Sequence, residues 1–313
     1  MYRVQNKILD ILNQPVFTGM EIRENAEMAA YTTYRVGGPA DFLVLPDQVE
    51  QLLELIKRLR EGEIPFFVLG EGSNLLVSDT GIRGVVISLK KCTAVLTLKS
   101  RNEIQAGAGV LLLEVVKFAE QHDITGIASL AGIPGTVGGA LVMNAGAFGS
   151  EIGDFVSKIE VINEHNELQV LLPEQVRFGY RSAPGFEGKI IISVIINGAY
   201  EAGAAVNLEN QRDEYVNRRE QKQPLNYGSC GSVFKRPQNN FAGALIEQAG
   251  CKGMKIGEAM VSPKHANFIV NLGGATASDI YRLIQQIKKR VYDNSGIKLE
   301  TEVKFIGDFP QLT

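Results

Sequence analysis

LAGIPGTVGGALVMNAGAFGSEIG, residues 130–153, is the segment that most constrains the architecture of this chain. Eight glycines lie between residues 126 and 153, where the overall content of 33 glycines in 313 residues predicts about three. Glycine allows positive φ angles and close approach to the backbone, and ordinary turns account for only about two or three of the eight. The excess predicts a side-chain-free surface against which a flat or charged ligand lies.

A second glycine loop, Gly70-Glu71-Gly72-Ser73-Asn74, precedes this segment. Consecutive N–H groups in such a loop can converge on a phosphate oxygen, and Ser73 and Asn74 add side-chain donors. The loop is not a Rossmann fingerprint, because it lacks the third glycine and leads into a predicted strand, and it lacks the Walker lysine. An ordinary turn remains an alternative. Together with the Arg35-Val36-Gly37-Gly38 turn, the loops predict an extended ligand such as a dinucleotide.

Hydrophobic periodicity around these loops predicts a mixed α+β chain. A strand (41–45), a helix (49–59) and a second strand (65–70) indicate a βαβ unit with a right-handed parallel crossover. Further predicted strands are 75–79, 84–90, 94–99, 103–109, 190–200, 267–274 and 299–307, with a hairpin around 164–167. Predicted helices are 1–13, 111–122, 207–223, 242–249 and 278–294, the last with Thr276 and Asp279 as a capping pair.

The small-residue run at 201–206 predicts a domain boundary. We expect an N-terminal helical arm (1–30), a ligand-binding domain (31–203, with subdomains of about 31–70 and 71–203) and a C-terminal domain (204–313). In an alternative, the last strand returns to the ligand-binding domain.

Composition excludes several classes of protein. With 45% hydrophobic and 21% charged residues the chain is an ordinary globular protein, and 32 basic against 35 acidic side chains do not indicate a nucleic-acid or membrane binder. Three cysteines without CxxC spacing and three dispersed histidines predict neither disulfides nor a metal site. No signal peptide or membrane-spanning run is present, so we expect a cytoplasmic protein without an obligate protein partner.

Three polar clusters are candidates for chemistry. Arg181, beside Tyr180, is suited to binding a carboxylate with two hydrogen bonds, although a surface ion pair is the simpler interpretation. The segment 228–237, GSCGSVFKRP, places Ser232 between turn glycines and a cationic pair, Lys235 and Arg236. In the segment 299–307, alternation puts Glu300 and Glu302 on one face, which is typical of a solvated edge strand.

Two residues are weaker candidates. His265 is a possible base, but the spacing assembles no Ser-His-Asp arrangement, and a structural histidine is the favoured interpretation. Cys230 is a possible nucleophile, but no partner histidine is identifiable in the sequence.

Seven motifs occur in an order that resembles the UDP-N-acetylenolpyruvoylglucosamine reductase family. They are YRVGGPADFLVLP, LGEGSNLLVSD, AGIPGTVGGALVMNAGAFG, FGYRSA, QPLNYGSCGSVFKRP, AGALIEQAGCKGMKIGEAMVSPKHANFIVN and LETEVKFIG, and they cover roughly residues 30–307. The resemblance implies a noncovalent FAD in a domain of the vanillyl-alcohol-oxidase (PCMH) type and a C-terminal α/β domain for a UDP-sugar. It also implies NADPH as the reductant and a role in peptidoglycan precursor synthesis.

The resemblance assigns roles to residues by motif. Arg181, Ser232 and Glu302 are the implied catalytic residues: Arg181 binds the enolpyruvyl carboxylate, Ser232 gives a proton to carbon 2, and Glu302, which cannot stabilise negative charge while ionised, is hypothesised to be protonated. Tyr180, Lys235 and Arg236 are implied to approach the substrate. The implied FAD contacts are Arg35, Gly37, Gly70, Glu71, Gly72, Ser73, Asn74, Ile133, Pro134, Gly135, Thr136, Gly138 and Gly139.

Two features distinguish this chain from the usual family pattern. Thr301 stands where the family usually has proline, and only 51 positions separate Arg181 from Ser232, which resembles the shorter form of the family without the extra tyrosine loop. Two other functions remain open from the residues: a flavin oxidase of the same fold, which would need neither Ser232 nor the cationic pair, and a nucleotide-binding protein without chemistry. A yellow purified protein would demonstrate flavin, and NADPH oxidation that depends on the enolpyruvyl sugar nucleotide would identify the reductase.

Overall fold

The computed structural model describes residues 2–310 and has the predicted α+β fold, with helices and strands mixed along the chain. The described residues pack into two compact units, each with its own apolar core. The first unit contains residues 2–23, 42–71 and 84–218, and the second contains residues 24–41, 72–83 and 219–310. The predicted domains 1–30, 31–203 and 204–313 remain a prediction, and residues 1 and 311–313 lie outside the described residues.

The first unit contains a five-stranded antiparallel sheet of order β12-β11-β13-β7-β6. β13 (Ile190–Asn197) lies in the middle, and its sequence IIISVIIN is buried at nearly every position. The predicted hairpin is confirmed, because Ile162 of β11 lies opposite Leu168 of β12. The other strands are β6 (Leu96–Ser100), β7 (Glu103–Gly107), β11 (Val156–Ile162) and β12 (Leu168–Leu171).

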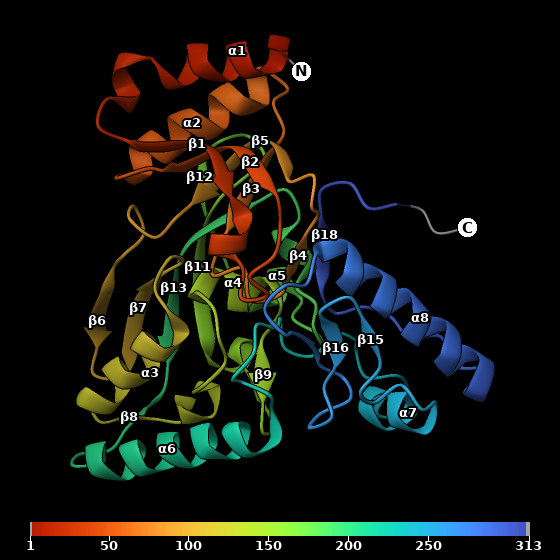
Figure 1. Ribbon diagram of the computed structural model, residues 1–313. Helices are drawn as coiled ribbons and strands as arrows, with labels where there is room; N and C mark the ends of the chain where they lie inside the picture. The colour runs from red at the N-terminus through yellow and green to blue at the C-terminus, as the bar shows by residue number, and fades with distance from the viewer. Residues whose placement is uncertain (1, 311–313) are drawn as a thin grey trace. The chain divides into compact units, whose positions relative to one another are not determined.

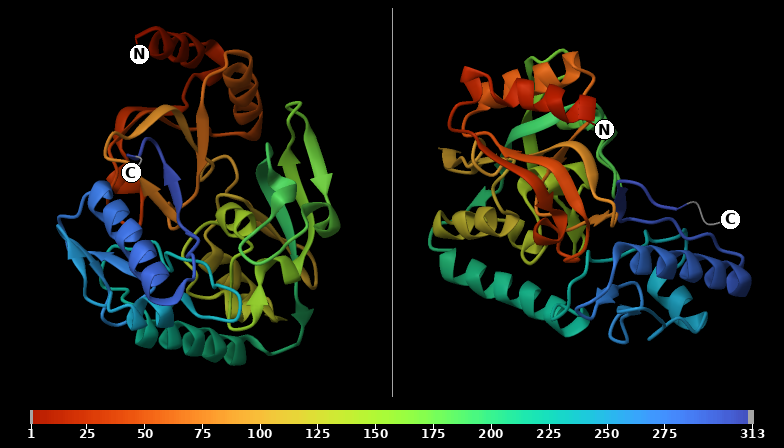
Figure 2. Two further views of the ribbon diagram at one scale, coloured as in Figure 1. Left: turned by 90° about the vertical axis from the view of Figure 1, so that its right-hand side faces the viewer. Right: turned by 45° about the horizontal axis from the view of Figure 1, so that its top comes forward.

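Six helices accompany the sheets, and the predicted helices at 1–13, 111–122 and 207–223 are confirmed. They are α1 (Tyr2–Leu12), α2 (Val49–Glu61), α3 (Leu112–Gln121), α4 (Val137–Val142), α5 (Pro173–Val176) and α6 (Ala205–Lys222). α1 and α2 lie side by side, as both views of Figure 2 show. The first unit also contains two short strand pairs, β8 (Ile124–Thr125) with β14 (Ala199–Tyr200) and β9 (Gly146–Ala147) with β10 (Ser150–Glu151). Its short 3-10 helices are η1 (Pro15–Phe17), η3 (Ile127–Leu130), η4 (Ile152–Phe155) and η5 (Pro184–Phe186).

A four-stranded sheet of order β1-β2-β5-β3 contains both strands of the predicted βαβ unit. The two strands that flank α2 are not neighbours, because β5 lies between them and β3 pairs in parallel with β5, Phe66 opposite Val85. β5 is buried at six of its seven positions, which is typical of an internal strand. The strands are β1 (Glu21–Glu27), β2 (Pro39–Leu45), β3 (Phe66–Leu69) and β5 (Ile82–Ser88).

In the second unit, α7 (Ala242–Gln248) and α8 (Ala277–Ser295) pack together, and α8 also lies against the strands β15 and β16 (Figure 1). These belong to a small antiparallel sheet, and a separate parallel pair joins β4 to β18. The predicted strand over 299–307 is regular only at its end, in β18. The remaining elements are β4 (Leu75–Val77), β15 (Lys255–Ile256), β16 (Ala259–Val261), β17 (Ile269–Asn271), β18 (Lys304–Ile306) and η2 (Met28–Tyr31).

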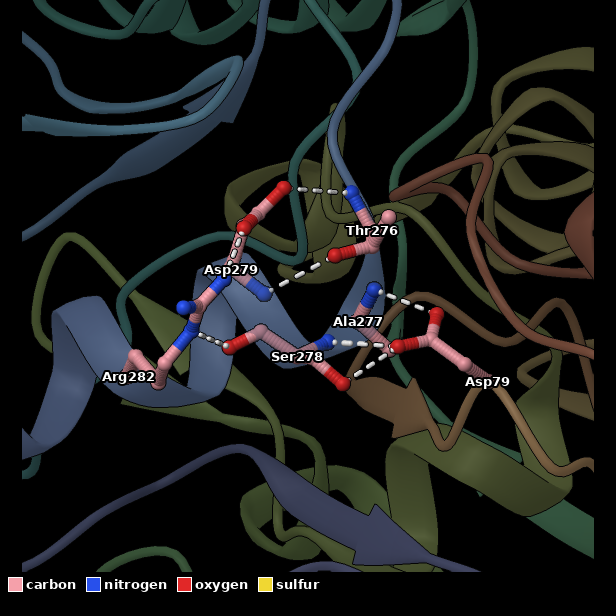
Figure 3. Close-up of polar contacts among 6 residues, drawn as sticks. All are labelled: Asp79, Thr276, Ala277, Ser278, Asp279 and Arg282. Atoms are coloured by element: carbon pink, nitrogen blue, oxygen red, sulfur yellow. Dashed lines mark hydrogen bonds and ion pairs between the residues drawn. The ribbon is translucent and has the colours of Figure 1, made fainter.

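The start of α8 is capped twice (Figure 3). The predicted capping pair is confirmed: Thr276 Oγ1 accepts from the Asp279 N–H at 3.0 Å, and Asp279 Oδ2 accepts from the Thr276 N–H at 3.1 Å. The carboxylate of Asp79, just after β4, accepts from the N–H groups of Ala277 and Ser278 at 2.8 and 2.9 Å. The segment that follows the first glycine loop is thus attached to the last helix.

Candidate active site

The first glycine loop joins β3 to β4, so a strand follows it, as predicted. Gly72 is buried with φ +61, and a Cβ atom there would lie 2.2 Å from the main-chain oxygen of Tyr31. Any side chain at this position would force the backbone apart. Glu71, in contrast, pairs with Lys90 at 2.5 Å and lies at the edge of the loop.

The second glycine segment is fixed against the chain before α3. The N–H groups of Val137 and Gly138 donate to the carbonyls of Val110 and Ala108 at 2.8 and 2.9 Å. Thr136 caps α4 by accepting from the Gly139 N–H at 3.3 Å. The predicted continuous loop therefore contains a short helix, because two good helix formers, Ala140 and Leu141, follow the glycines.

The two glycine segments meet within the first unit. A Cβ atom on Gly70 would lie 2.7 Å from Thr136 Oγ1, so the loops are in contact only because residue 70 has no side chain. Directly before the second segment in sequence, the buried Ser129 hydroxyl in η3 has no hydrogen-bond partner within the described residues. Bare backbone from two loops together with hydroxyl groups fits a ligand with phosphates and a planar ring.

Packing explains why the Arg35-Gly38 turn contains a glycine at position 37. A Cβ atom on Gly37, at φ +122, would lie 2.8 Å from the Val77 Cβ, so glycine is required where the turn packs on β4. Arg35 is exposed, at φ +57. Cofactor contacts at Arg35 and Gly37 remain predictions.

Arg181 lies in a tight turn of the first unit. Gly179 and Ser182 close the turn with reciprocal hydrogen bonds of 2.9 and 3.0 Å, and Arg181 adopts φ +51, a conformation that L-residues other than Asn and Asp rarely take. Its guanidinium donates to the main-chain oxygens of Gly146 at 3.0 Å and Asn144 at 3.4 Å. The strained backbone and the two carbonyls place the cation beside the second glycine segment.

Ser232 and Glu302 come together in the second unit. The N–H of Glu302 donates to the carbonyl of Val233, the residue after Ser232, at 2.8 Å, and an isolated bridge pairs Phe234 with Thr301. Asn267 holds the Ser232 side of this pairing, because its carbonyl accepts from the Val233 N–H at 2.9 Å. Two residues that are distant in sequence are thus joined by main-chain pairing.

Asn74 of the first glycine loop touches the same pairing from the other side. Its amide donates to the main-chain oxygen of Glu302 at 3.1 Å, and its carbonyl accepts from the Lys304 N–H at 3.0 Å. A predicted cofactor-loop residue and a predicted catalytic residue are therefore neighbours.

The predicted substrate-binding side chains are accessible. Lys235 Nζ lies 3.4 Å from Glu300, whose side chain is 78% exposed, and such an exposed pair contributes little stability. Arg236 lies over the ring of Phe241, 4.7 Å from its centroid, and the half-exposed ring of Tyr180 lies near Arg181. Glu300 therefore takes the solvated position that alternation predicts.

Cys230 and His265 have structural surroundings. Burial raises the pKa of the Cys230 thiol to about 12, so the thiolate that a nucleophile requires is absent at neutral pH. Burial lowers the pKa of His265, whose Nδ1 accepts from the Asn267 N–H at 3.2 Å, and its ring packs edge-on against Phe268. These contacts agree with the structural interpretation of His265.

Two further observations concern the described residues. None of the helices between residues 2 and 310 combines the length and apolar character needed to span a bilayer. Over the same range, no three His, Cys, Asp or Glu side chains gather in a way that could hold a metal ion.

Known proteins match both parts of the chain. A family model described as an FAD binding domain matches residues 40–171, and one described as the C-terminal domain of UDP-N-acetylenolpyruvoylglucosamine reductase matches residues 223–306. A reductase of that name from Clostridium botulinum is 42% identical over 97% of this chain and 99% of its own length. Another, from Caldanaerobacter subterraneus, is 44% identical over 91% of this chain and 93% of its own length.

A solved structure agrees with these sequences. The crystal structure of UDP-N-acetylenolpyruvylglucosamine reductase from Thermus caldophilus is 34% identical and covers 92% of this chain and 99% of its own, with a TM-score of 0.77. The fold and the glycine loops, with the FAD-binding match, define a flavoprotein oxidoreductase with a PCMH-type FAD domain and a further C-terminal domain. The chain belongs to the UDP-N-acetylenolpyruvoylglucosamine reductase family, and FAD is its cofactor, as the sequence predicted.

Proposed function

We propose that this chain reduces UDP-N-acetylglucosamine enolpyruvate to UDP-N-acetylmuramate, a peptidoglycan precursor, with electrons from NADPH. The family and its FAD-binding domain support the proposal. Bound FAD supplies the hydride chemistry between the nicotinamide and carbon 3 of the enolpyruvyl group. The backbone of residues 70–74 and 133–139 holds this cofactor, and the two substrates react in turn, which gives ping-pong kinetics.

Arg181 binds the carboxylate of the enolpyruvyl group. Reduction at carbon 3 pushes negative charge toward this carboxylate, and a preorganised guanidinium stabilises that charge by about 3–4 kcal/mol in such sites. The two carbonyls that hold Arg181 orient the cation without cancelling its charge, because carbonyl oxygens carry only partial charge.

Ser232 gives its hydroxyl proton to carbon 2, and Glu302, in its protonated form, supports the charge that develops beside it. General acid catalysis of this kind contributes about 10²–10⁴-fold. The observation that carries this assignment is the hydrogen bond between the Glu302 N–H and the Val233 carbonyl, because it places the two residues in one paired segment. Tyr180, Lys235 and Arg236 contact the sugar nucleotide, and Lys235 or Arg236 binds its diphosphate.

Stopped-flow measurement of Ser232→Ala tests the proposal. We expect flavin reduction by NADPH at the wild-type rate, and oxidation by the enolpyruvyl substrate slowed by about 10²–10⁴-fold. Ser229→Ala, a hydroxyl removed from the same loop, is the matched control and should leave both half-reactions intact. Equal slowing of the two half-reactions in Ser232→Ala would reject the proton-donor role.

A further inference from the structure

Asn144 is a buried polar residue that no role assigned so far explains. It follows α4, its side chain is 1% exposed, and its backbone is left-handed with φ +41. We propose that Asn144 is a positioning residue for Arg181, fixing both the turn that carries this arginine and the direction of its guanidinium. The inference rests on the proposed function of Arg181 in binding the substrate carboxylate.

The side chain of Asn144 joins its own segment to two others in the first unit, the start of η4 and the turn that carries Arg181. Its Nδ2 donates to the carbonyl of Gly179 at 3.0 Å and to Glu151 Oε2 at 2.5 Å. Its Oδ1 accepts from the Gly153 N–H at 3.0 Å. Because Gly179 begins the turn that contains Arg181, the amide of Asn144 ties that turn to the second glycine segment.

The main chain of Asn144 acts on the other end of Arg181. Arg181 Nη1 donates to the Asn144 carbonyl at 3.4 Å, and Nη2 donates to the Gly146 carbonyl at 3.0 Å. The left-handed conformation sets the direction of the first of these carbonyls, and asparagine is one of the few residue types that adopts it readily. One residue therefore holds the base of the arginine through its side chain and the tip through its backbone.

Two variants of Asn144 separate its contacts. Asn144→Gly keeps the left-handed backbone and removes all three side-chain hydrogen bonds. Asn144→Asp keeps the size and the acceptor for Gly153, but sets an oxygen against Glu151 and the Gly179 carbonyl. Asn166→Gly is the matched control, because Asn166 is also left-handed, at φ +64, lies in the same unit, and bonds a guanidinium, that of Arg60 at 2.7 Å.

In stopped-flow measurements we expect both Asn144 variants to keep their flavin and to be reduced by NADPH within about twofold of the wild-type rate. Oxidation by the enolpyruvyl substrate should slow by about 10–100-fold, the usual cost of losing a supporting contact behind a reacting group. Binding of UDP-N-acetylmuramate, followed by the flavin absorption spectrum, should weaken in parallel. Asn166→Gly should change neither quantity, whatever its thermal stability.

The double variant Asn144→Gly/Arg181→Gln distinguishes positioning from a structural role. If Asn144 acts through Arg181, the double variant should oxidise within about twofold of Arg181→Gln alone. Additive losses, equal slowing of both half-reactions, or wild-type oxidation in both Asn144 variants would each overturn the inference. If Arg181→Gln itself oxidised at the wild-type rate, the proposed function of Arg181 would fail first, which is a separate outcome.

Discussion

The Arg181 turn and the Ser232–Glu302 pairing hold their side chains by different means. In the first unit, Arg181 depends on a strained backbone and on the side chain of Asn144. In the second unit, the segments that carry Ser232 and Glu302 are paired by main-chain hydrogen bonds, and the side chains of Asn74 and Asn267 add bonds to this pairing. The proposed reaction thus relies on one region positioned through a neighbouring side chain and on another paired through its backbone.

Gly153→Ala should disturb the side-chain-dependent region most. A Cβ atom there would lie 2.8 Å both from Asn144 Oδ1 and from the ring of Phe178, so the methyl group must displace the amide that holds the Arg181 turn. We expect a loss of about 1–3 kcal/mol in unfolding free energy, from overpacking. Substrate oxidation in stopped flow should slow by about tenfold, with flavin reduction unchanged.

Gly274→Ala is the control for this change, because its Cβ atom would meet only the Glu258 side chain at an ordinary 3.4 Å. If substrate oxidises the flavin of the two variants at the same rate, the Arg181 turn does not depend on its neighbouring side chains.

Asp279→Asn should have a smaller, pH-dependent effect, because the second unit does contain one side-chain-held element, the start of α8. Burial raises the pKa of Asp279, but hydrogen bonds from Thr276 and the Arg282 guanidinium lower it more, and the net pKa is lowered. The carboxylate therefore contributes stability above its unfolded pKa of about 3.9, and this contribution is lost as the pH falls through the lower folded value.

Urea unfolding at pH 7 should show Asp279→Asn less stable by about 0.5–1 kcal/mol, and the difference from wild type should vanish in strong acid. Asp293→Asn, on the exposed surface of the same helix, is the control and should show no such pH dependence. A difference that persisted unchanged to pH 2 would show that charge is not the cause.

Thr301→Pro should have the smallest effect. The pairing opposite Phe234 uses the N–H of Glu302 and the carbonyl of Glu300, and not the N–H of Thr301, so proline removes no bond of the pairing. We expect the free energy of unfolding to change by no more than about 1 kcal/mol, with an increase if proline stiffens the unfolded chain. The rate of flavin oxidation by substrate should be unchanged. A large loss of oxidation would show that side-chain identity matters here as well.

The sequence predicts elements well where local signals agree. Thr276 and Asp279 at the start of α8 and Gly296, at φ +70, after its end are local signals that need no tertiary information. The βαβ pattern around α2 predicts β2 and β3 but not that β5, later in sequence, lies between them, because that order depends on tertiary pairing. The strand predicted over 299–307 is shorter because Thr301 pairs with Phe234 in a single bridge.

In the candidate active site, too, residues with a local sequence signal were predicted, and a residue defined by tertiary contacts was not. The glycine loops are visible in sequence as an excess of one residue type, and the family motifs carry Arg181, Ser232 and Glu302. Asn144 was not predicted, because an asparagine acquires a special role only when three segments meet around it. Its position in Asn-Ala-Gly, a turn-forming sequence, is the one local signal that could have indicated it.

The order in which the ribosome makes the chain gives the Asp79 contact a further consequence. Asp79 meets the start of α8 across a sequence separation of 198 residues, and β4 obtains its partner strand only when β18 has been made. The second unit therefore has to wait for the last part of the chain, with β4 exposed during synthesis. In a nascent chain arrested before residue 277, the five-stranded sheet of the first unit should consequently resist protease, whereas residues 72–83 should still be cleaved.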